Sequence, residues 1–359
     1  MKENQTKRLD NYRNSSIELL RIIAMMGVVI LHYNNGQMGG GFQYVREGSI
    51  NQMVLFLSES LFIGSVNLFV MISGYFLCKT QKRRFIKVVE LVVQVLAFSE
   101  GFYLLRVISG TMSFSVGEFL LNLIPKNYFV ILYATLYFIS PYFNLMIDKI
   151  SKQQYQKLLI LLMALFSIWT IGIDYLEGFL GITLNGSSTI GCYGSQAGYT
   201  IVNFAMMYMI GAYIRIYGIN FSKQKNLICL VSTLLLIFML SYIENRFGSG
   251  PIATWNYNNP LVIIFATLLL LYIIRYSFES RIINELAKGA FTCFLFHTAC
   301  LPFMKIQTFV NSNFVVLIFH QILVGIALYL VSYLVYKVYT WCTGWFIRMI
   351  QPACSKLDM

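Results

Sequence analysis

The sequence predicts an all-α integral membrane protein with about ten transmembrane helices and both termini in the cytoplasm. The first observation is composition: 57% of the 359 residues are hydrophobic and only 12% are charged, whereas a soluble domain has about 25% charged residues. The second is that many apolar runs reach the roughly 20 residues that a helix needs to cross the hydrocarbon core. The third is that basic residues gather on one side of those runs, as the positive-inside rule describes for cytoplasmic loops.

Hydropathy and the length of the apolar runs divide the chain into ten predicted spans. They lie at residues 17–34, 53–77, 88–109, 128–147, 158–176, 200–217, 226–243, 260–276, 289–310 and 314–337. With the N-terminus inside, the basic residues on the external side are only Arg46, Arg106, Lys126, Arg246 and Lys305. The net charge of +12 therefore reflects topology, and binding to nucleic acid is not predicted.

We expect one membrane domain over residues 1–359, with a core at about 12–345 and no appended soluble domain. The polar, basic start has no A-x-A-like cleavage site, so the first span is expected to remain as an anchor. The aromatic segment YTWCTGWFIRMIQ at 339–351 is expected to lie along the inner membrane surface. The seven cysteines show no disulfide framework or CxxC spacing, and the three histidines are isolated, so no metal site is predicted.

The first span lies within IELLRIIAMMGVVILHYNNG at 17–36 and contains Glu18, Arg21 and His32. A charged side chain at the centre of a membrane helix costs at least about 2.5 kcal/mol, and such residues usually have a function. In a helix the step from Arg21 to His32 turns by about 1100° and rises by about 16 Å, so the two side chains share one face. Glu18 falls on the same face. The spacing predicts a polar stripe that points into the bundle.

Two interpretations of this stripe are open. Glu18 and Arg21 could form no more than an i,i+3 ion pair at the membrane interface, worth about 0.2–0.5 kcal/mol. His32 is the stronger functional candidate, because histidine titrates near neutral pH and is the usual general base.

The pattern of Arg21 and His32 resembles the first helix of the membrane-bound acyltransferase 3 family. VNLFVMISGYFL at 66–77 is similar to the second-helix signature of that family, with Ser73-Gly74-Tyr75 expected to form a turn before a basic loop. YFVILYATLYFISPYFN at 128–144 and FTCFLFHTACL at 291–301 are similar to later family segments. The resemblance implies ten helices with both ends inside, and transfer of an acyl group, usually acetyl from acetyl-CoA, to a hydroxyl of a cell-surface glycan or a related acceptor.

The resemblance also implies roles for the polar stripe. His32 would act as general base or proton relay for the acceptor hydroxyl. Arg21 would orient the acyl donor or stabilise charge on the thioester oxygen, and Glu18 would hold Arg21 in place. No permanently bound cofactor is implied, because the acyl-CoA is a substrate.

The donor phosphates need a basic site, and the richest cytoplasmic cluster is KTQKRRFIK at 79–87. Arg83 and Arg84 would bind phosphate, with Lys82 and Lys87 adding charge. A cytoplasmic loop after a span is expected to be basic in any case, so topology alone is an equal explanation. The family commonly has Arg-x-x-Arg here, whereas Lys87 stands at the second position, and lysine does not fork to two oxygens.

A second departure concerns the Trp…Glu…Tyr…Pro signature of the family branch that includes O-antigen acetyltransferases. Counting back from Pro141 puts Tyr137 at the tyrosine, Tyr133 at the glutamate and Tyr128 at the tryptophan. The carboxylate is missing from this chain, so no role for it is carried over.

Four further residues are predicted to line the cavity, namely Asn67, Ser73, Tyr75 and His297. For Asn67 an inter-helix hydrogen bond is at least as good an explanation. For His297 a packing or tautomer-fixing role is favoured over catalysis.

The sequence therefore favours an acyl-CoA-dependent O-acyltransferase in the cytoplasmic membrane of a bacterium, acting on an envelope polysaccharide or its lipid-linked precursor. The alternative is a transporter or flippase of a polyprenyl-linked sugar. A transporter of that kind is expected to spread its charges over several helices and to break paired spans with Gly and Pro. The acceptor sugar, the acyl group and the oligomeric state stay open.

Overall fold

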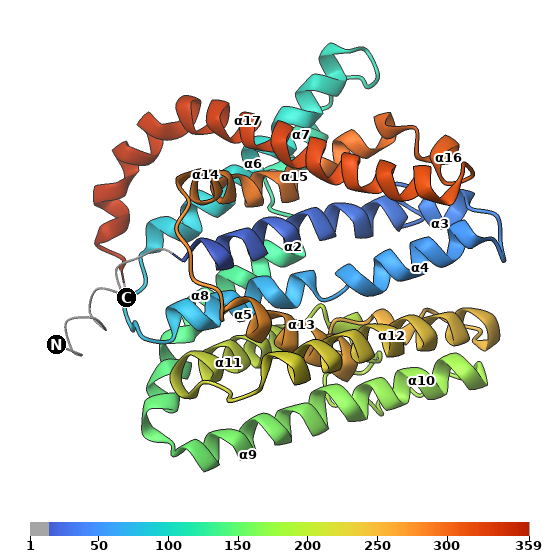
Figure 1. Cartoon of the computed structure of the whole chain (residues 1–359). Coiled ribbons are helices and arrows are strands. Elements are labelled where there is room, and N and C mark those ends of the chain that lie inside the picture. The colour runs from blue at the N-terminus through green and yellow to red at the C-terminus, as the bar shows by residue number, and fades with distance from the viewer. Residues whose placement is uncertain (1–13, 359) are drawn as a thin grey trace.

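The computed structural model describes residues 14–358, and every regular element in this part of the chain is a helix (Figure 1). Nine helical segments within it are long and apolar enough to cross a membrane. They are Ser15–Asn34, Ile50–Leu77, Phe85–Ile108, Tyr128–Lys149, Lys152–Leu180, Lys223–Phe247, Ala253–Ile273, Arg281–Met304 and Phe314–Ser355. A tenth apolar helix, α11 (Ile201–Tyr217), is shorter, with 17 residues. Each predicted span overlaps one of these segments, and the prediction of an all-α membrane protein is confirmed.

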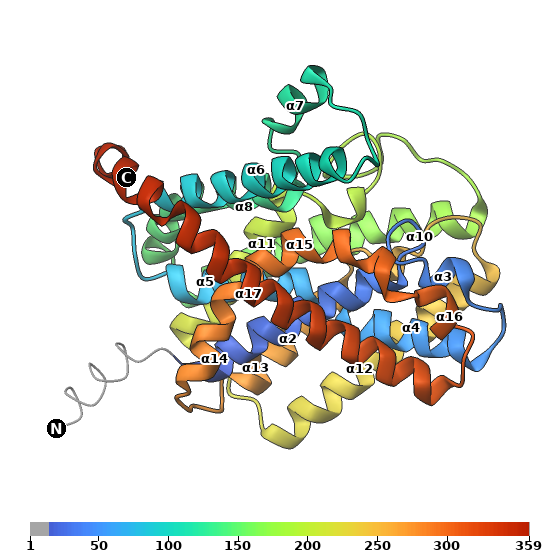
Figure 2. The same cartoon turned by 90° about the horizontal axis from the view of Figure 1, so that it is seen from above.

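The long helices run side by side, as Figures 1 and 2 show. They are α2 (Ser15–Asn34), α4 (Ile50–Phe62), α5 (Ser65–Leu77), α6 (Phe85–Ile108), α8 (Tyr128–Lys149), α9 (Lys152–Met163), α10 (Thr170–Leu180), α11, α12 (Lys223–Phe247), α13 (Pro260–Ile273), α15 (Ala290–Cys300) and α17 (Phe314–Ser355). The short helices are α3 (Gly41–Tyr44), α7 (Val116–Asn122), α14 (Arg281–Leu286) and α16 (Ile306–Phe309), and a π-helical stretch, η1 (Ala164–Trp169), joins α9 to α10. Single 3₁₀ turns are η2 (Gln196–Gly198), η3 (Ala253–Trp255), η4 (Ala287–Gly289) and η5 (Leu301–Met304).

Polar side chains just before the apolar runs set where many helices begin. Asn14 accepts a hydrogen bond from the backbone N–H of Ser16 at the start of α2. Ser151 and Gln154 form a reciprocal capping box at the start of α9. Each such cap stabilises a helix by about 1 kcal/mol, because it satisfies backbone donors that have no partner within the helix.

The second predicted span, 53–77, is two helices rather than one. α4 ends at Phe62 and α5 begins at Ser65, with Ile63 and Gly64 between them. The segment Ile50–Leu77 is apolar enough on average to count as one span, so hydropathy did not reveal the break.

The predicted turn at Ser73-Gly74-Tyr75 is wrong, because all three residues lie inside α5. Gly74 serves packing instead. A Cβ on Gly74 would lie 2.0 Å from the carbonyl oxygen of Tyr208 on α11, and a Cβ on Gly211 would lie 2.0 Å from that of Met71 on α5. The two glycines let the backbones of α5 and α11 touch, as small residues do between membrane helices.

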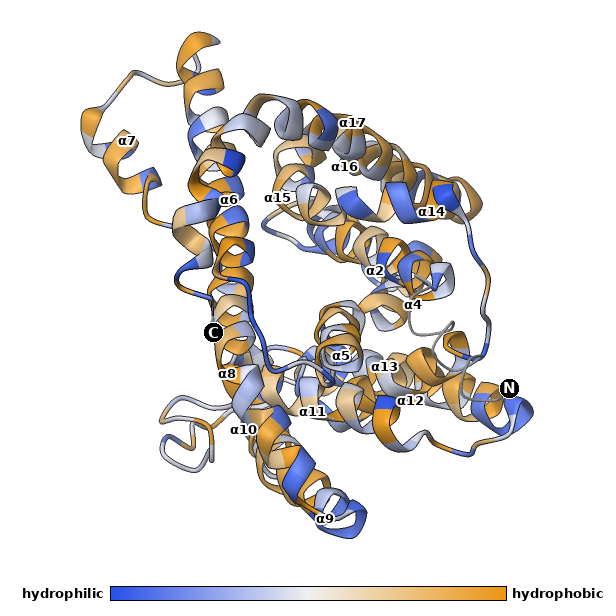
Figure 3. Ribbon diagram, turned by 90° about the vertical axis from the view of Figure 1, so that its left-hand side faces the viewer, coloured by the Kyte–Doolittle hydropathy of each residue, from blue (hydrophilic) through white to orange (hydrophobic). Residues whose placement is uncertain are grey.

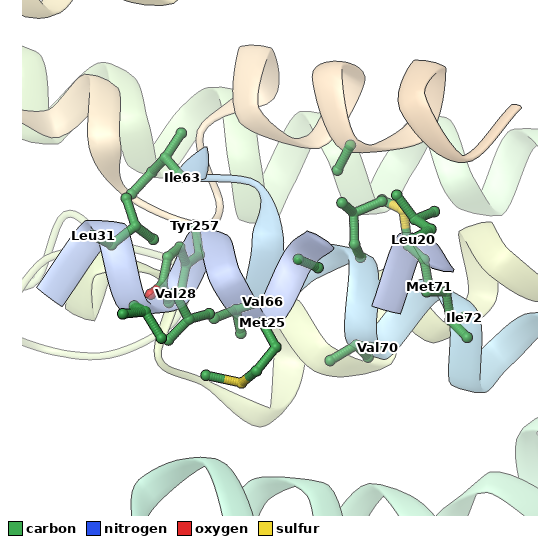
Figure 4. Close-up of a cluster of buried hydrophobic side chains, with 14 of the residues drawn as sticks. Leu20, Met25, Val28, Leu31, Ile63, Val66, Val70, Met71, Ile72 and Tyr257 are labelled. Atoms are coloured by element: carbon green, nitrogen blue, oxygen red, sulfur yellow. The ribbon is translucent and has the colours of Figure 1, made fainter. Parts of the chain in front are cut away.

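α2 lies in the middle of the bundle and contacts α4, α5, α15 and α17 (Figures 1 and 2). Figure 4 shows Val28 and Leu31 of α2 near Ile63, Val66 and Tyr257 in a buried apolar cluster. In lipid, such packing stabilises mainly through van der Waals contact, because lipid tails are as apolar as the side chains. Figure 3, which looks along the helices, places α6 and α8 on one side and α2 and α5 on the other.

α17 extends far beyond the predicted span 314–337. It has 42 residues and ends at Ser355, which corresponds to about 63 Å at 1.5 Å per residue and to about twice the hydrocarbon thickness. Its C-terminal part leaves the bundle (Figure 1) and exposes Trp341 and Trp345. The aromatic segment at 339–351 is thus helical, and its position along a membrane surface stays a prediction.

Candidate active site

Three adjoining cavities lie between α6 and α8 on one side and α2, α5 and α15 on the other. The basic cavity, of about 560 Å³, has a lining that includes Arg21, Ser73, Lys82, Arg84, Lys87, Tyr133 and Tyr137. The middle cavity, of about 460 Å³, is mainly apolar and includes Met25, Val28, Val66, Phe69, Phe129 and Phe294. The histidine cavity, of about 430 Å³, includes His32, Glu59, Lys126, Tyr128, Tyr199 and Tyr257.

Shared lining residues place the three cavities in one row, which we call the path. Arg21 and Tyr133 belong to both the basic and the middle cavity. Val28, Val66 and Phe294 belong to both the middle and the histidine cavity. The step towards His32 is therefore bounded by apolar side chains, which would admit a neutral chain and exclude a phosphate group, because an unpaired charge in an apolar environment is costly.

One face of α2 lines the whole path. Arg21 contributes to the basic and middle cavities, Met25 to the middle cavity, Val28 to the middle and histidine cavities, and His32 to the histidine cavity. These positions follow the i, i+4, i+7, i+11 spacing of a helix face. The polar residues predicted from the sequence thus lie at the two ends of this face. Arg21 and His32 are about 16 Å apart along the helix axis.

α8 lines the path from the opposite side with tyrosines. Tyr128 lies in the histidine cavity, Tyr133 in the middle and basic cavities, and Tyr137 in the basic cavity. The hydroxyl of Tyr133 is 3.2 Å from Oγ of Ser73. The position at which the family branch has a glutamate therefore carries a neutral hydroxyl that points at α5.

His32 is paired with His297, a residue of α15 far away in the sequence. Nδ1 of His32 is 2.6 Å from Nε2 of His297, and the two rings stack with their centroids 4.8 Å apart. His297 is fully buried, and its Nδ1 lies 2.7 Å from the backbone carbonyl oxygen of Cys293. The three groups form a chain that runs from the backbone of α15 to the histidine cavity.

The carbonyl at the start of this chain fixes the proton positions in the neutral pair. A carbonyl oxygen only accepts, so Nδ1 of His297 carries the hydrogen and donates to Cys293. Nε2 of His297 then accepts, and Nδ1 of His32 must donate to it. The lone pair of His32 is thereby placed on Nε2. Among the described residues no group is hydrogen-bonded to this nitrogen, and it is not sealed from solvent. The arrangement leaves His32 able to take a proton from a group in the cavity.

The other end of the stripe is an ion pair. Nη1 of Arg21 donates to Glu18, with an N–O distance of 3.1 Å to Oε2. Glu18 is buried, whereas Arg21 is partly exposed towards the basic and middle cavities. Arg21 and His32 therefore line different cavities, and one thioester group is too small to contact both. The sequence-based role of Arg21 in stabilising charge on the same thioester that His32 serves is not compatible with this separation.

The basic loop divides into residues that line the cavity and one that does not. Lys82, Arg84 and Lys87 line the basic cavity, and Nζ of Lys87 also pairs with Glu90 at 2.6 Å. Arg83 is only 1% exposed. Its guanidinium donates to Oγ of Ser140 and to the backbone of 77–82, which are contacts within the fold. The prediction that Arg83 binds donor phosphate does not fit this burial, because its donors are already taken.

The four residues predicted to line the cavity have different places. Ser73 lines the basic and middle cavities. Asn67 is buried and donates to the carbonyl oxygen of Tyr257 at 2.7 Å. Its amide oxygen accepts from Asn203 on α11 at 3.3 Å, which is the inter-helix bond offered as its alternative. The hydroxyl of Tyr75 accepts from Arg215 at 3.2 Å, away from the path. His297 lies behind His32 and reaches the cavity only through it.

Sequence reasoning gave no role to Glu59, which lines the histidine cavity. The signal was an unexplained carboxylate inside a predicted span, the kind of residue that is functional by default in membranes. Among residues 14–358, no group of three His, Cys, Asp or Glu side chains is placed to hold a metal ion.

The fold and the site together define a multi-pass membrane protein with a row of adjoining cavities, one basic at one end and one lined by His32 at the other. A family model described as an acyltransferase domain matches residues 14–337. The chain therefore belongs to the acyltransferase 3 family and is a membrane acyltransferase. No curated protein and no solved structure matches the chain.

Proposed function

We propose that the protein transfers an acetyl group from acetyl-CoA to a hydroxyl of a cell-envelope polysaccharide or of its lipid-linked precursor, in the cytoplasmic membrane of a bacterium. The observation that supports this most is the joined path, because its two ends have the chemistry that the two substrates need. Cationic side chains at one end suit the phosphates of a CoA thioester, and a histidine lone pair at the other suits a hydroxyl.

The donor enters at the basic cavity. Lys82, Arg84 and Lys87 bind its phosphates, and Arg21, held by Glu18, positions the start of its neutral arm. The arm passes the apolar junction at Val28 and Val66 so that the thioester arrives beside His32. The cost of desolvating the phosphates between the apolar walls of the junction keeps them in the basic cavity.

The acceptor meets the thioester in the histidine cavity. Nε2 of His32 takes the hydroxyl proton while the hydroxyl oxygen attacks the thioester carbon. The carbon–sulfur bond then breaks, and the CoA sulfur leaves as the thiol after it receives the proton from His32. The atoms balance without any further reactant, and the products are the O-acetyl ester and free CoA.

The basic cavity faces the cytoplasm in this proposal, because the loop at 79–87 is the richest in positive charge and CoA thioesters are made inside the cell. The histidine cavity then faces the outer leaflet. His32 lies beyond the apolar junction, so the acyl group crosses most of the membrane before it is transferred.

Proton NMR of the surface polysaccharide tests the proposed function. A deletion strain is complemented with the wild type, with His32→Ala or with His320→Ala, where His320 lines none of the three cavities. We expect O-acetyl signals with the wild type and with His320→Ala, and a reduction of about 10²–10⁴-fold in the transfer rate for His32→Ala at equal membrane abundance. Identical signals from the deletion strain and every complemented strain would contradict polysaccharide acetylation.

A further inference from the structure

The histidine cavity contains a carboxylate that the reaction proposed above does not use. Glu59 lies in α4, one turn before the break at Ile63 and Gly64, within the membrane-length segment Ile50–Leu77. It lines the same cavity as His32. A carboxylate at this depth is costly unless its oxygens find hydrogen-bond donors, so its partners indicate what it is for.

One oxygen of Glu59 is held firmly by the protein. Oε2 accepts a hydrogen bond of 2.8 Å from Nδ2 of Asn34 on α2. The amide oxygen of Asn34 in turn accepts one of 2.9 Å from Gln321 on α17. Asn34 and Gln321 are both buried. Three helices therefore fix the carboxylate in one orientation.

The second oxygen is left for a ligand. Oε1 of Glu59 receives no hydrogen bond from the residues that the structure describes, yet it is not sealed from solvent. Glu100 on α6 makes a useful contrast, because both of its carboxylate oxygens are buried without a partner and it lines none of the three cavities. Of these two carboxylates, Glu59 is the one that lines the cavity of His32.

Aromatic rings form another wall of this cavity. The ring of Tyr199 meets those of Tyr128 and Tyr257 edge to face, at 4.7 Å and 5.0 Å between centroids. Burial raises the pKa of the Tyr199 hydroxyl, so that hydroxyl stays neutral. A wall of tyrosines offers apolar faces together with hydroxyl groups, which suits a ligand that is itself both apolar and hydroxylated.

The cavity has no excess of one charge. Lys126 and Glu59 both line it, so a cationic or an anionic ligand would meet one attractive and one repulsive side chain. A neutral ligand with hydroxyl donors needs no such compensation. The volume of about 430 Å³ lies within the range of roughly 300–1,000 Å³ that small-molecule sites have.

We propose that Glu59 binds the acceptor by accepting a hydrogen bond from a hydroxyl next to the one that His32 deprotonates. The acceptor in this cavity is therefore a neutral sugar residue with two adjacent hydroxyl groups. This inference rests on the proposed function, and it adds the class of acceptor and the residue that selects it. Glu59 touches the substrate but takes no proton from it.

The test measures transfer of radiolabelled acetyl from acetyl-CoA to octyl glucoside, octyl galactoside and octyl mannoside, and to monodeoxy analogues of the best of them. The purified full-length protein is used in lipid nanodiscs. Glu59→Gln keeps the shape of the side chain and an oxygen for Asn34, but turns an N–H donor towards the cavity. Glu100→Gln is the matched control, because it removes a second membrane carboxylate outside the path.

We expect Glu59→Gln to raise the KM for the glycoside by about 10- to 100-fold, the size expected when a buried hydrogen bond to the acceptor is lost. The KM for acetyl-CoA should stay unchanged, and Glu100→Gln should behave as the wild type. The monodeoxy glycoside that lacks the hydroxyl bound by Glu59 should be a poor acceptor for the wild type. Glu59→Gln should reduce the acetylation of this analogue only a little further. Equal use of every monodeoxy analogue by the wild type would overturn the inference even if Glu59→Gln failed to fold.

Binding of radiolabelled octyl glycoside without any acyl-CoA separates this inference from the proposed function. Binding that weakens with Glu59→Gln, in a protein that transfers no acetyl, would overturn the proposed function and leave the sugar site supported. Absence of glycoside binding by the wild type, or binding that Glu59→Gln leaves unchanged, would overturn the sugar site.

Discussion

His32 owes its chemistry to residues that do not touch the cavity. The carbonyl of Cys293 orients His297, and His297 orients His32. A histidine has two ring nitrogens, and the bond that one of them makes decides which carries the proton. We therefore expect His297 to act as a positioning residue, so that its removal affects the rate more than binding.

His297→Leu should lower kcat for acyl transfer by about 10- to 100-fold, as loss of an orienting partner typically does, with KM for acetyl-CoA unchanged. His297→Gln should retain more activity, because its amide oxygen can accept from Nδ1 of His32. Steady-state kinetics with the purified protein measures both, and His320→Gln serves as the control at the remaining histidine of the chain. Equal kcat for His297→Leu and the wild type would show that His32 needs no orienting partner.

Arg83 and Arg84 are neighbours with opposite environments, and the difference gives a second test at the residue scale. Arg84→Ala should raise the KM for acetyl-CoA by roughly tenfold, the effect of one lost charge-assisted hydrogen bond. It should leave the melting temperature near that of the wild type.

Arg83→Ala should do the reverse, because it strips buried partners such as Oγ of Ser140 of their donor. The free energy of unfolding should fall by about 1.5–3 kcal/mol, with KM for acetyl-CoA unchanged in the protein that remains folded. Thermal melting in detergent and the KM for acetyl-CoA are measured for both Arg83→Ala and Arg84→Ala. Matching effects of the two substitutions would contradict the separation of the loop into a lining and a buried part.

Periodicity predicted the residues on α2 and missed those that depend on other elements. Arg21 and His32 share a face because helix geometry alone places them there, and the structure adds Met25 and Val28 between them. The local sequence does not distinguish Arg83 from Arg84, because Arg83 is buried by contacts with α8 and α11, which are distant in the sequence. The partner of His32 on α15 could not be read from spacing either, because tertiary packing brings the two together.

At the scale of elements, the backbones of α5 and α11 touch, and Gly74 and Gly211 make that contact. The resemblance of this segment to the family's second-helix signature predicted a turn at Ser73-Gly74-Tyr75. The close approach to Tyr208 explains the glycine instead. α5 also carries Val66, Phe69 and Ser73 into the path, so its packing against α11 sets one wall of the site.

Gly74→Ala should lower the free energy of unfolding by about 1–3 kcal/mol, as an extra methyl in a tight contact does. It should also reduce acyl transfer, because α5 must shift. Gly172→Ala on α10 is the control, since nothing lies within 4 Å of a Cβ at that position. Thermal melting and transfer assays measure both variants, and an unchanged melting temperature for Gly74→Ala would refute the close contact.

Element boundaries were predicted well where polar residues flank an apolar run and poorly where they do not. The break between α4 and α5 escaped hydropathy, because the whole segment Ile50–Leu77 is apolar on average. The length of α17 escaped it because the aromatic segment after Lys337 continues the helix. The break matters for function, since Glu59 and Val66 lie on its two sides and both line the histidine cavity.

At the scale of the whole molecule, the path separates the basic cavity, where we propose that the donor is held, from the histidine cavity, where its acyl group would react. Val28, Val66 and Phe294 line both the middle and the histidine cavity and form the apolar junction between them. Val66→Trp should block transfer while acetyl-CoA still binds at the basic cavity. Leu57→Trp, on the exposed face of α4, should transfer acetyl as the wild type does, and transfer assays with labelled acetyl-CoA compare them.

Full activity of Val66→Trp would show that the acyl group takes another route. Retained binding of acetyl-CoA by this variant is the check that its fold is intact.

The most direct test of the account is acyl transfer across a sealed bilayer. The protein is reconstituted in vesicles with the loop at 79–87 facing outwards, labelled acetyl-CoA is added outside, and an impermeant envelope oligosaccharide from a deletion strain is trapped inside. We predict that label appears on the trapped oligosaccharide and that Val66→Trp and His32→Ala abolish it. Label on an oligosaccharide only when it is supplied on the same side as acetyl-CoA would contradict the path.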